Sequence, residues 1–320
     1  MKTNKLVLCV FGFSLLFTVA AARAADAPKL TFKFTRASVP GSLQTIVAGI
    51  NNEGVMVGQY LDKGKGFSHG FVLSGKKLTT LDVPNGHDTG ATGINFNGAI
   101  TVVGSYISSS GKSVGFRYTP RTKQFTDIPG PEGATPSYVT GVNDRGWIVG
   151  SYVDSKGAFH GFLLQGRIYT TLDVPGAVVT SPHGINNKGN ISLTWLDSNY
   201  AFKGALYNYK SKKYQAIDVP GAGPLGSQAT CINNEGDITF WWWDSSRLVH
   251  GALCTKCASK KGRKYYKFDY PHAADTAANT YPNGINDNHA FVGEYDDSVY
   301  GFLLGFEATF KITNTNHQPK

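Results

Sequence analysis

A short motif, Gly-Ile-Asn or a close variant of it, returns six times along this chain of 320 residues. Successive asparagines of the motif are 44, 48, 43, 47 and 53 residues apart, and they are Asn51, Asn95, Asn143, Asn186, Asn233 and Asn286. A regular repeat of this length is typical of architectures in which each copy is one supersecondary unit that cannot bury its apolar face alone. The chain is therefore expected to stack six such units against one another.

Three further marks keep step with the asparagines. The first is Val-Gly-x-Tyr, which begins at Val57 in copy one and has Trp195 and Trp242 at the aromatic position of copies four and five. The second is a His-Gly-Phe motif or variant, represented in the last copy by Tyr300-Gly301-Phe302. The third is Asp-Val-Pro or a variant, which ends five of the copies. Glycines supply positive φ for turns, and proline ends a strand because it cannot extend the ladder.

Each copy is expected to contain four strands. In copy three these are residues 138–142, 147–153, 159–164 and 168–174, separated by turns rich in Gly, Asn and Asp. Four short strands in about 45 residues form the blade of a propeller. The composition agrees, since the chain has 38 glycines, 14 prolines and only 2 methionines. We predict an all-β fold, a six-bladed β-propeller with four strands per blade.

Ring closure has a candidate at the N-terminal end. Residues 31–40 resemble a fourth strand without preceding partners, whereas the last copy has three strands and then a divergent tail, residues 307–320. We expect the N-terminal strand to complete the last blade within a propeller domain of residues 25–306. Two alternatives stay open: the tail fills that place, or the units form a linear solenoid.

The repeat also resembles a known family. Gly-Ile-Asn-Asn-x-Gly, Val-Gly-x-Tyr, His-Gly-Phe and Thr-Leu-Asp-Val-Pro-Gly-Ala are together similar to the bacterial extracellular HAF repeat, over residues 31 to about 306. Copies four to six match less well, because Leu193, Phe240 and Ala205 replace expected residues. The resemblance implies export and a propeller-like array, and it implies no particular activity.

The first 24 residues are typical of a secretory signal, with Lys2 and Lys5 before an apolar stretch and small residues at the end. The product is expected to be secreted, either extracellular or periplasmic, without a membrane span and as a monomer. Without residues 1–24 the chain has 28 basic and 22 acidic residues. This modest surplus suits acidic polysaccharides or an envelope surface only if it is concentrated on one face; we expect solvated lysines in turns and no nucleic-acid partner.

Three cysteines remain after such processing: Cys231, Cys254 and Cys257. An odd number leaves at least one thiol without a partner inside the chain. We favour a disulfide, either the local pair Cys254 and Cys257 or one linked to Cys231, over unpaired thiols and over metal or redox chemistry. No sequence motif for catalysis, metal binding or a cofactor stands out, so none of these is predicted.

Departures from the repeat are the best candidates for a site. Copy five has three consecutive tryptophans where the others have Val-Gly-x-Tyr; alternation puts Trp241 and Trp243 on one face, and Trp242, at the aligned aromatic position, on the other. We expect Trp242 to pack between blades and its two neighbours to be more exposed. Local repacking between blades is the alternative.

Loops that connect the second strand to the third, or one blade to the next, gather on one face of a propeller. We predict Arg247 on the first kind of loop, with Asp244 at the end of the strand before it, and His183 and His272 on the second kind. The ligand-binding candidates are thus Trp241, Trp243, Asp244, Arg247, His183 and His272. The histidines that recur before glycine, His69, His160 and His250, are expected to lie too far apart to share a metal.

These observations favour an exported, non-catalytic propeller that acts as a binding or scaffold module, with extracellular or envelope polysaccharide as the leading ligand. A hydrolase or lyase that acts on an anionic glycan through the loop-rich face is the alternative. It requires a carboxylate pair or a metal cluster within reach of one bond.

Overall fold

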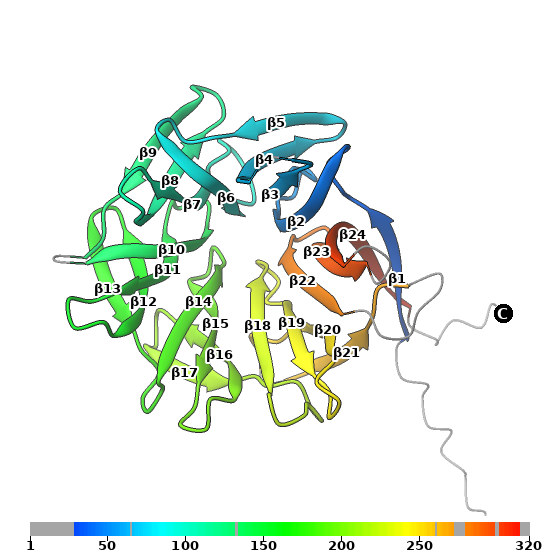
Figure 1. Cartoon of the computed structure of the whole chain (residues 1–320). Coiled ribbons are helices and arrows are strands. Elements are labelled where there is room, and N and C mark those ends of the chain that lie inside the picture. Colours follow the sequence, from blue (N-terminus) through cyan, green and yellow to red (C-terminus); the bar gives the residue numbers. More distant parts are fainter. Residues whose placement is uncertain are drawn as a thin grey trace, which may run out of the picture. The chain divides into compact units, whose positions relative to one another are not determined.

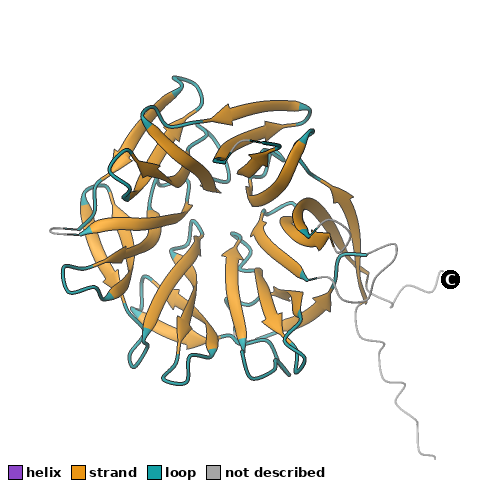
Figure 2. Ribbon diagram, viewed as in Figure 1, coloured by secondary structure: helices purple, strands orange, loops and turns teal. Residues whose placement is uncertain are grey.

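A computed structural model describes residues 29–64, 66–131, 134–259, 261–271, 279–297 and 301–313. The unit Leu30–Lys311 is a ring of six four-stranded antiparallel sheets, and the described residues are strands joined by loops and turns (Figure 2). The predicted six-bladed propeller is confirmed. The four strands predicted for copy three also match the four strands of the blade formed by residues 135–172.

In each blade the first strand lies nearest the central axis and the others follow outward (Figure 1). Blade 1 consists of β2 (Ser42–Ile50), β3 (Met56–Asp62), β4 (Ser68–Ser74) and β5 (Lys77–Leu81). Blade 2 consists of β6 (Gly86–Ile94), β7 (Val102–Ser108), β8 (Ser113–Thr119) and β9 (Gln124–Ile128). Blade 3 consists of β10 (Thr135–Val142), β11 (Ile148–Val153), β12 (Phe159–Gln165) and β13 (Ile168–Leu172).

The remaining blades repeat this pattern. Blade 4 consists of β14 (Val179–Ile185), β15 (Asn190–Leu196), β16 (Phe202–Asn208) and β17 (Lys213–Ala216). Blade 5 consists of β18 (Ser227–Ile232), β19 (Ile238–Trp243), β20 (Val249–Thr255) and β21 (Lys264–Phe268). Blade 6 consists of β22 (Thr280–Ile285), β23 (Ala290–Asp297), β24 (Phe302–Thr313) and, from the other end of the chain, β1 (Lys29–Arg36).

The N-terminal strand closes the ring as predicted. Strand β1 is the outermost strand of blade 6 and pairs with β24. Two of its rings anchor it, because Phe32 lies edge-on to Phe291 at 5.8 Å and Phe34 packs on Phe306 at 5.6 Å. The first and last strands of the repeat array therefore share one sheet and one apolar cluster.

The last copy of the His-Gly-Phe mark was placed wrongly. In blade 3 the motif pairs with β11 so that Phe162 lies opposite Gly150. In blade 6 the residue opposite Gly293 is Phe306, so the equivalent triplet is Leu304-Gly305-Phe306 and not Tyr300-Gly301-Phe302. Tyr300 lies outside the described residues. Strand β24 continues past residue 306 to Thr313.

A small residue faces a large one at the centre of every blade. Gly150 lies opposite the fully buried Phe162, and a Cβ atom added to Gly150 would lie 2.2 Å from the carbonyl oxygen of Tyr138. Blades 4 and 5 exchange the two sides, since Leu193 lies opposite Ala205 and Phe240 lies opposite Ala252. The replacements that weaken the sequence match are thus paired changes that preserve side-chain volume in the core.

Four of the six repeated asparagines bind the next blade through their side chains. Asn186 caps its own turn, where its Oδ1 accepts from the backbone N–H groups of Lys188 and Asn190, each at 3.0 Å. Its Nδ2 donates to the carbonyl of Asn233 in the next blade at 2.9 Å. Equivalent inter-blade bonds run from Asn143 to blade 4, from Asn233 to blade 6 and from Asn286 to blade 1.

The ring is not uniform. In blade 2 the Nδ2 of Asn95 stays within its own turn and donates to the carbonyls of Asn97 and Ala99. In blade 1 the Nδ2 of Asn51 donates to the carboxylate of Glu53, also in its own turn. Residues next to the asparagines complete the circle, as when the N–H of Asp287 donates to Asn52 Oδ1 and the N–H of Asn52 donates to the carbonyl of Phe96. The turns therefore meet around one axis, as the repeat predicted.

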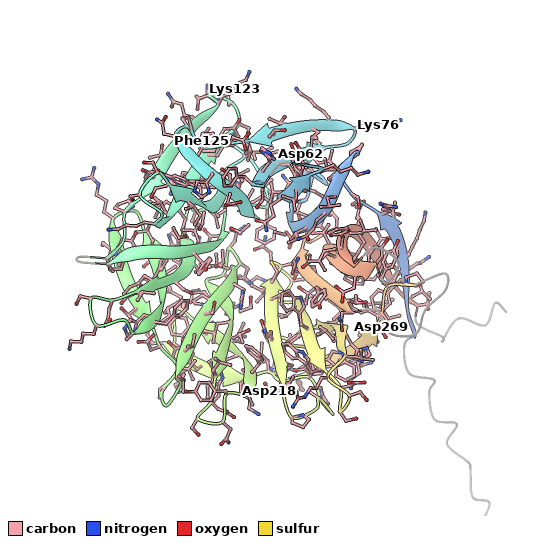
Figure 3. All side chains as sticks on the ribbon, viewed as in Figure 1. Asp62, Lys76, Lys123, Phe125, Asp218 and Asp269 are labelled. Atoms are coloured by element: carbon pink, nitrogen blue, oxygen red, sulfur yellow. A yellow bond between two sulfur atoms is a disulfide. The ribbon has the colours of Figure 1, made fainter. Side chains whose placement is uncertain are left out.

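Of the two disulfides that the sequence left open, the local one forms: it joins Cys254 to Cys257 at the end of β20, while Cys231 is a free cysteine. Figure 3 places Lys76 and Lys123 at the outer margin, where both side chains are exposed in turns between third and fourth strands. Among the described residues, no helical segment has the length and hydropathy needed for a membrane crossing.

Candidate functional site

A cavity of about 310 Å³ occupies the centre of the ring. Its wall comes from the first strands of all six blades and from the second strands of blades 5 and 6, and it consists of Ile46, Ala48, Thr92, Thr140, His183, Gln228, Thr230, Cys231, Trp241, Asn283 and Glu294. Next to it, toward the asparagine turns, the channel narrows to a space of about 30 Å³. Inner strands come very close there, because a Cβ atom on Gly284 would lie 2.7 Å from Gly49 Cα. The larger cavity is the candidate site.

Residues three positions before each asparagine line this cavity, and most of them bind the next blade. The Thr140 hydroxyl donates to the carbonyl of Pro182 at 2.8 Å, and the Thr230 hydroxyl donates to the carbonyl of Pro282 at 2.8 Å. Thr92 donates likewise to the carbonyl of Val139 at 2.5 Å. These hydroxyl protons are committed to backbone carbonyls, so toward the cavity the hydroxyl oxygens can act as acceptors.

His183 occupies the same position in blade 4 but has no such role. The bond to the next blade is made instead by Ser192, whose hydroxyl donates to the carbonyl of Thr230 at 3.2 Å. The Nε2 atom of His183 is buried and has no hydrogen-bond partner. Burial lowers the pKa of His183 to about 4, so the imidazole is neutral near pH 7. A buried polar atom without a partner, in the wall of a cavity, is a group ready to bond a ligand.

Glu294 is the acidic member of the wall. It is 5% exposed, and its Oε2 accepts from Asn283 Nδ2 at 2.5 Å. The same Asn283 amide donates to the carbonyl of Val47 in blade 1 at 3.1 Å, which fixes the carboxyl between blades 6 and 1. Burial raises the pKa of Glu294 to about 8; the Asn283 bond opposes the rise and the charge of Asp296 adds to it. The group is mostly protonated at neutral pH.

Trp241 provides the aromatic part of the wall. At the same position of the second strand the other blades have smaller or flexible side chains, which are Gln59, Ser105, Ser151, Thr194 and Glu294. The indole Nε1 donates to the carbonyl of Pro282 at 3.0 Å, and the ring lies edge-on to Tyr281 at 5.1 Å. Both contacts are to blade 6, so the indole is held in one orientation beside the cavity.

The predicted difference in burial within the tryptophan run is confirmed, since Trp242 is 9% exposed and both neighbours are only partly buried. The two neighbours do not form one surface, however. Trp243 stacks on Phe202 of blade 4 at 4.9 Å, with an angle of 12° between the rings, whereas Trp241 packs against blade 6. Trp241 lines the cavity and Trp243 does not.

The other predicted residues are scattered. Asp244 caps its loop by accepting from the N–H groups of Ser246 and Leu248, and Arg247 is exposed in the same loop with a φ of 69°. His183 was predicted in a connection between blades, which is wrong: it lies within β14, because the innermost strand begins earlier than the Gly-Ile-Asn motif suggests. His272 lies outside the described residues. Among the predicted residues that the structure describes, Trp241 and His183 are brought together in the cavity wall and the others are not.

The recurring histidines have a structural role. His160 Nδ1 lies 2.7 Å from Asp173, and its Nε2 lies 3.4 Å from Asp154, so the ring links the second, third and fourth strands of blade 3. Burial opposes protonation of His160, but the hydrogen bonds and charges of the two aspartates prevail and raise its pKa. His69 and His250 have the same two kinds of partner in blades 1 and 5. In the described part of the chain, no three such side chains gather as metal ligands would.

Sequence reasoning missed Glu294, Asn283 and Gln228. One signal was available for Glu294: it is an acid at a position that is neutral in every other blade, inside the apolar run 290–295. Asn283 was detectable in the same way, because it replaces the Thr or Ala that precedes most of the glycines. Nothing in the sequence links these positions to His183, which is about 100 residues away.

The chain matches no protein-family model, and no curated protein is similar to it in sequence. Its fold is similar to several solved structures. The SapL1 lectin in complex with alpha methyl fucoside aligns with a TM-score of 0.53 at 9% identity, over 87% of this chain and 98% of that one. TolB from Acinetobacter baumannii gives 0.50 at 9% identity, over 83% and 63%. Trypanosoma rangeli sialidase in complex with the inhibitor DANA gives 0.52 at 11%, over 85% and 55%.

The chain thus spans less than two thirds of the length of TolB and of the sialidase, and most of the lectin. At these identities the likeness is one of fold. It confirms that the chain is a propeller, and a propeller hosts many activities, so function has to be argued from the cavity itself.

Proposed function

We propose that this chain is a non-catalytic binding propeller that holds a saccharide in the central cavity. The observation that carries the proposal is Trp241, an indole fixed in the wall of a cavity among neutral hydrogen-bonding side chains. Small-molecule sites combine apolar and aromatic walls with a few polar groups that orient the ligand. A saccharide suits such a wall, because its ring has an apolar face of C–H groups and an edge of hydroxyls.

The polar groups around Trp241 fit hydroxyls in particular. Hydroxyls both donate and accept, and the wall offers threonine oxygens as acceptors, the protonated Glu294 as a donor, and the partnerless Nε2 of His183. The cavity volume of about 310 Å³ is at the lower end of the range for small-molecule sites. These features support one sugar residue of a longer glycan as the occupant.

A lectin and a sialidase among the structures of the same fold add a reason to test glycans first. The argument is one of analogy, because the fold alone is shared.

Hydrolysis of a glycan is the alternative. A buried acid with a pKa of about 8 suits a general acid, and Glu294 has this property. Glycoside hydrolysis ordinarily uses two carboxyl groups on either side of the bond. Glu294 is the single carboxyl among the described residues that line the cavity. The wall therefore favours binding over hydrolysis.

The proposal includes export to the periplasm or the cell exterior, where envelope or environmental polysaccharides occur. It rests on the signal-like pattern of residues 1–24 and on the similarity to the HAF repeat. The disulfide between Cys254 and Cys257 supports it, since disulfides persist in oxidising compartments.

A glycan array probed with the purified chain tests the proposal, with Trp241→Ala as the test variant and Trp243→Ala as the matched control. Both tryptophans are partly buried on β19, but only Trp241 lines the cavity. We expect the wild type to bind at least one class of glycan, Trp241→Ala to bind at least tenfold more weakly, and Trp243→Ala to bind normally. Circular dichroism confirms that both variants are folded. The absence of glycan binding by the wild type, or a loss confined to Trp243→Ala, contradicts the proposal.

A further inference from the structure

Two ionisable side chains of opposite type line the central cavity, and both are neutral near pH 7. Burial raises the pKa of Glu294 to about 8 and lowers that of His183 to about 4. No basic side chain at the wall would stabilise an ionised Glu294, because neither Lys nor Arg is among the described residues that line the cavity. This contrasts with the chain as a whole, which has 31 basic and 22 acidic residues.

The other titratable groups around the cavity do not change this balance. Asp296 lies on the same strand as Glu294, accepts from Asn279 Nδ2 at 2.5 Å, and adds negative charge near Glu294. Burial raises the pKa of Tyr281 to about 12 and also raises the pKa of the Cys231 thiol, so both stay protonated near pH 7. Blade 1 contributes only Ile46, Ala48 and a backbone carbonyl to this side of the cavity.

We propose that the cavity selects an uncharged sugar residue and that Glu294 is the residue that sets this specificity, by donating its carboxyl proton to an oxygen of the ligand. The inference rests on the proposed function and names the class of saccharide for the same site. The Asn283 amide keeps the carboxyl at the wall between blades 6 and 1, with one oxygen occupied by the amide. The second oxygen is the one available to a ligand.

The physical reason is desolvation. A uronic or sialic acid would bring a carboxylate into a site that has no cation to pair with it, next to a carboxyl and near the charge of Asp296. Transfer of a carboxylate from water into a cavity without a cation to pair with it is strongly unfavourable. A neutral sugar loses only the hydration of its hydroxyls, and the wall replaces those hydrogen bonds. An acidic polysaccharide, which the sequence favoured only if the basic surplus lay on one face, is thus disfavoured in this cavity.

An amino sugar is the competing occupant, because an ammonium group could ionise Glu294 and pair with it. The excess of basic residues in the chain opposes a cation. One oxygen of Glu294 already accepts a hydrogen bond from Asn283, and the hydroxyls of the nearby threonines donate to backbone carbonyls. The wall offers one donor, Glu294, among several threonine acceptors, and this arrangement matches a hydroxyl better than an ammonium group. Binding of an amino sugar is one of the outcomes that the experiment distinguishes.

The experiment uses matched sugars that differ at one position: glucosides, glucuronides and glucosaminides, together with the galactose equivalents, printed at equal density. The probes are the wild-type chain, Glu294→Gln and Trp241→Ala, each at pH 7 and pH 9. We expect binding of the neutral sugars only. At pH 9, one unit above the pKa of Glu294, the protonated fraction falls about tenfold, and wild-type binding should fall with it.

Glu294→Gln keeps a hydrogen-bond donor of similar shape that does not ionise. It should bind neutral sugars at pH 7 within a factor of about three of wild type and should not weaken at pH 9. Preferred binding of uronates or of amino sugars, or an unchanged pH dependence in Glu294→Gln, overturns the inference. If charged sugars bind and Trp241→Ala removes that binding, the saccharide site stands and only its specificity is wrong. If no sugar binds, both proposals fail.

Discussion

The ring of asparagine turns and the ring of residues three positions earlier lie on the same six strands, yet they differ in kind. At the turns, one residue type recurs in all six blades; its side chain caps the turn, and in four blades it also binds the next blade, as in Asn186. At the earlier positions the residue types differ between blades: Ala48, Thr92, Thr140, His183, Thr230 and Asn283.

The difference teaches how a repeat protein can separate structure from function. The threonine hydroxyls of the earlier ring also bind the next blade. In blade 4 the hydroxyl of Ser192 makes this bond in place of His183, and the Nε2 atom of His183 has no partner. A position that is repeated without change supports the blade. A position whose structural bond has been taken over by a neighbour is the better candidate for ligand contact.

The largest expected effect is on the asparagine ring. Asn186→Ala removes two capping bonds and the inter-blade bond of a fully buried side chain, and should lower the free energy of unfolding by about 3 kcal/mol. Asn95→Ala, whose amide bonds only its own turn, should cost about half as much. Urea unfolding monitored by tryptophan fluorescence measures both losses. Equal losses of unfolding free energy would show that the inter-blade bond of Asn186 adds no stability. Weakened glycan binding by either folded variant would show that the asparagine turns also affect the ligand site.

A smaller effect is expected from acidification. The pKa of His183 falls from 6.5 to about 4 on folding, so between these values the native state binds fewer protons than the unfolded state. The contribution of His183 to stability should therefore be complete above pH 6.5 and decline by on the order of 3 kcal/mol as the pH falls to about 4, while the raised pKa of Glu294 acts in the opposite direction below about pH 8. His183→Thr should remove this part of the decline while it abolishes most glycan binding. A pH profile of unfolding that is identical in the variant would show that His183 does not titrate as its burial requires.

The smallest effect concerns the inter-blade hydroxyls. Thr140→Val keeps the shape of the side chain but loses the donor to the carbonyl of Pro182, and should cost about 1 kcal/mol. At pH 7, His183→Thr should cost less than this or stabilise the chain, because it removes a buried polar atom that lacks a partner. Thermal unfolding of the two variants side by side decides the order. A greater loss in His183→Thr would mean that the imidazole supports the fold.

Most of the fold could be predicted from the sequence because the same physical requirement returns in each copy. The capping asparagine and the turn glycines are needed six times, so the period and the blade are readable without a structure. Blade 3 has Gly150 opposite Phe162, whereas blade 5 has Phe240 opposite Ala252, and in the sequence this change looks like a weaker match to the repeat. It is compensation across a strand pair, which is visible only once the register is known.

Register also explains the misplaced motif in the last blade. Gly301-Phe302 and Gly305-Phe306 both carry the expected residues, and only pairing with Gly293 selects the second. For the site, Trp241 stood out because it breaks the pattern within its own copy. Glu294 did not, because it stands at the variable position of an intact Val-Gly-x-Tyr motif, and most of its neighbours in the cavity come from other blades. A closed ring brings together residues that a linear sequence keeps apart.

The pairing of β1 with β24 has a consequence for how the protein is made. The strand that is synthesised first must wait for a partner that is synthesised last, across more than 260 residues of intervening chain. Contacts of such long range slow folding, and until the last blade is made the phenylalanines of β1 are exposed and prone to aggregation.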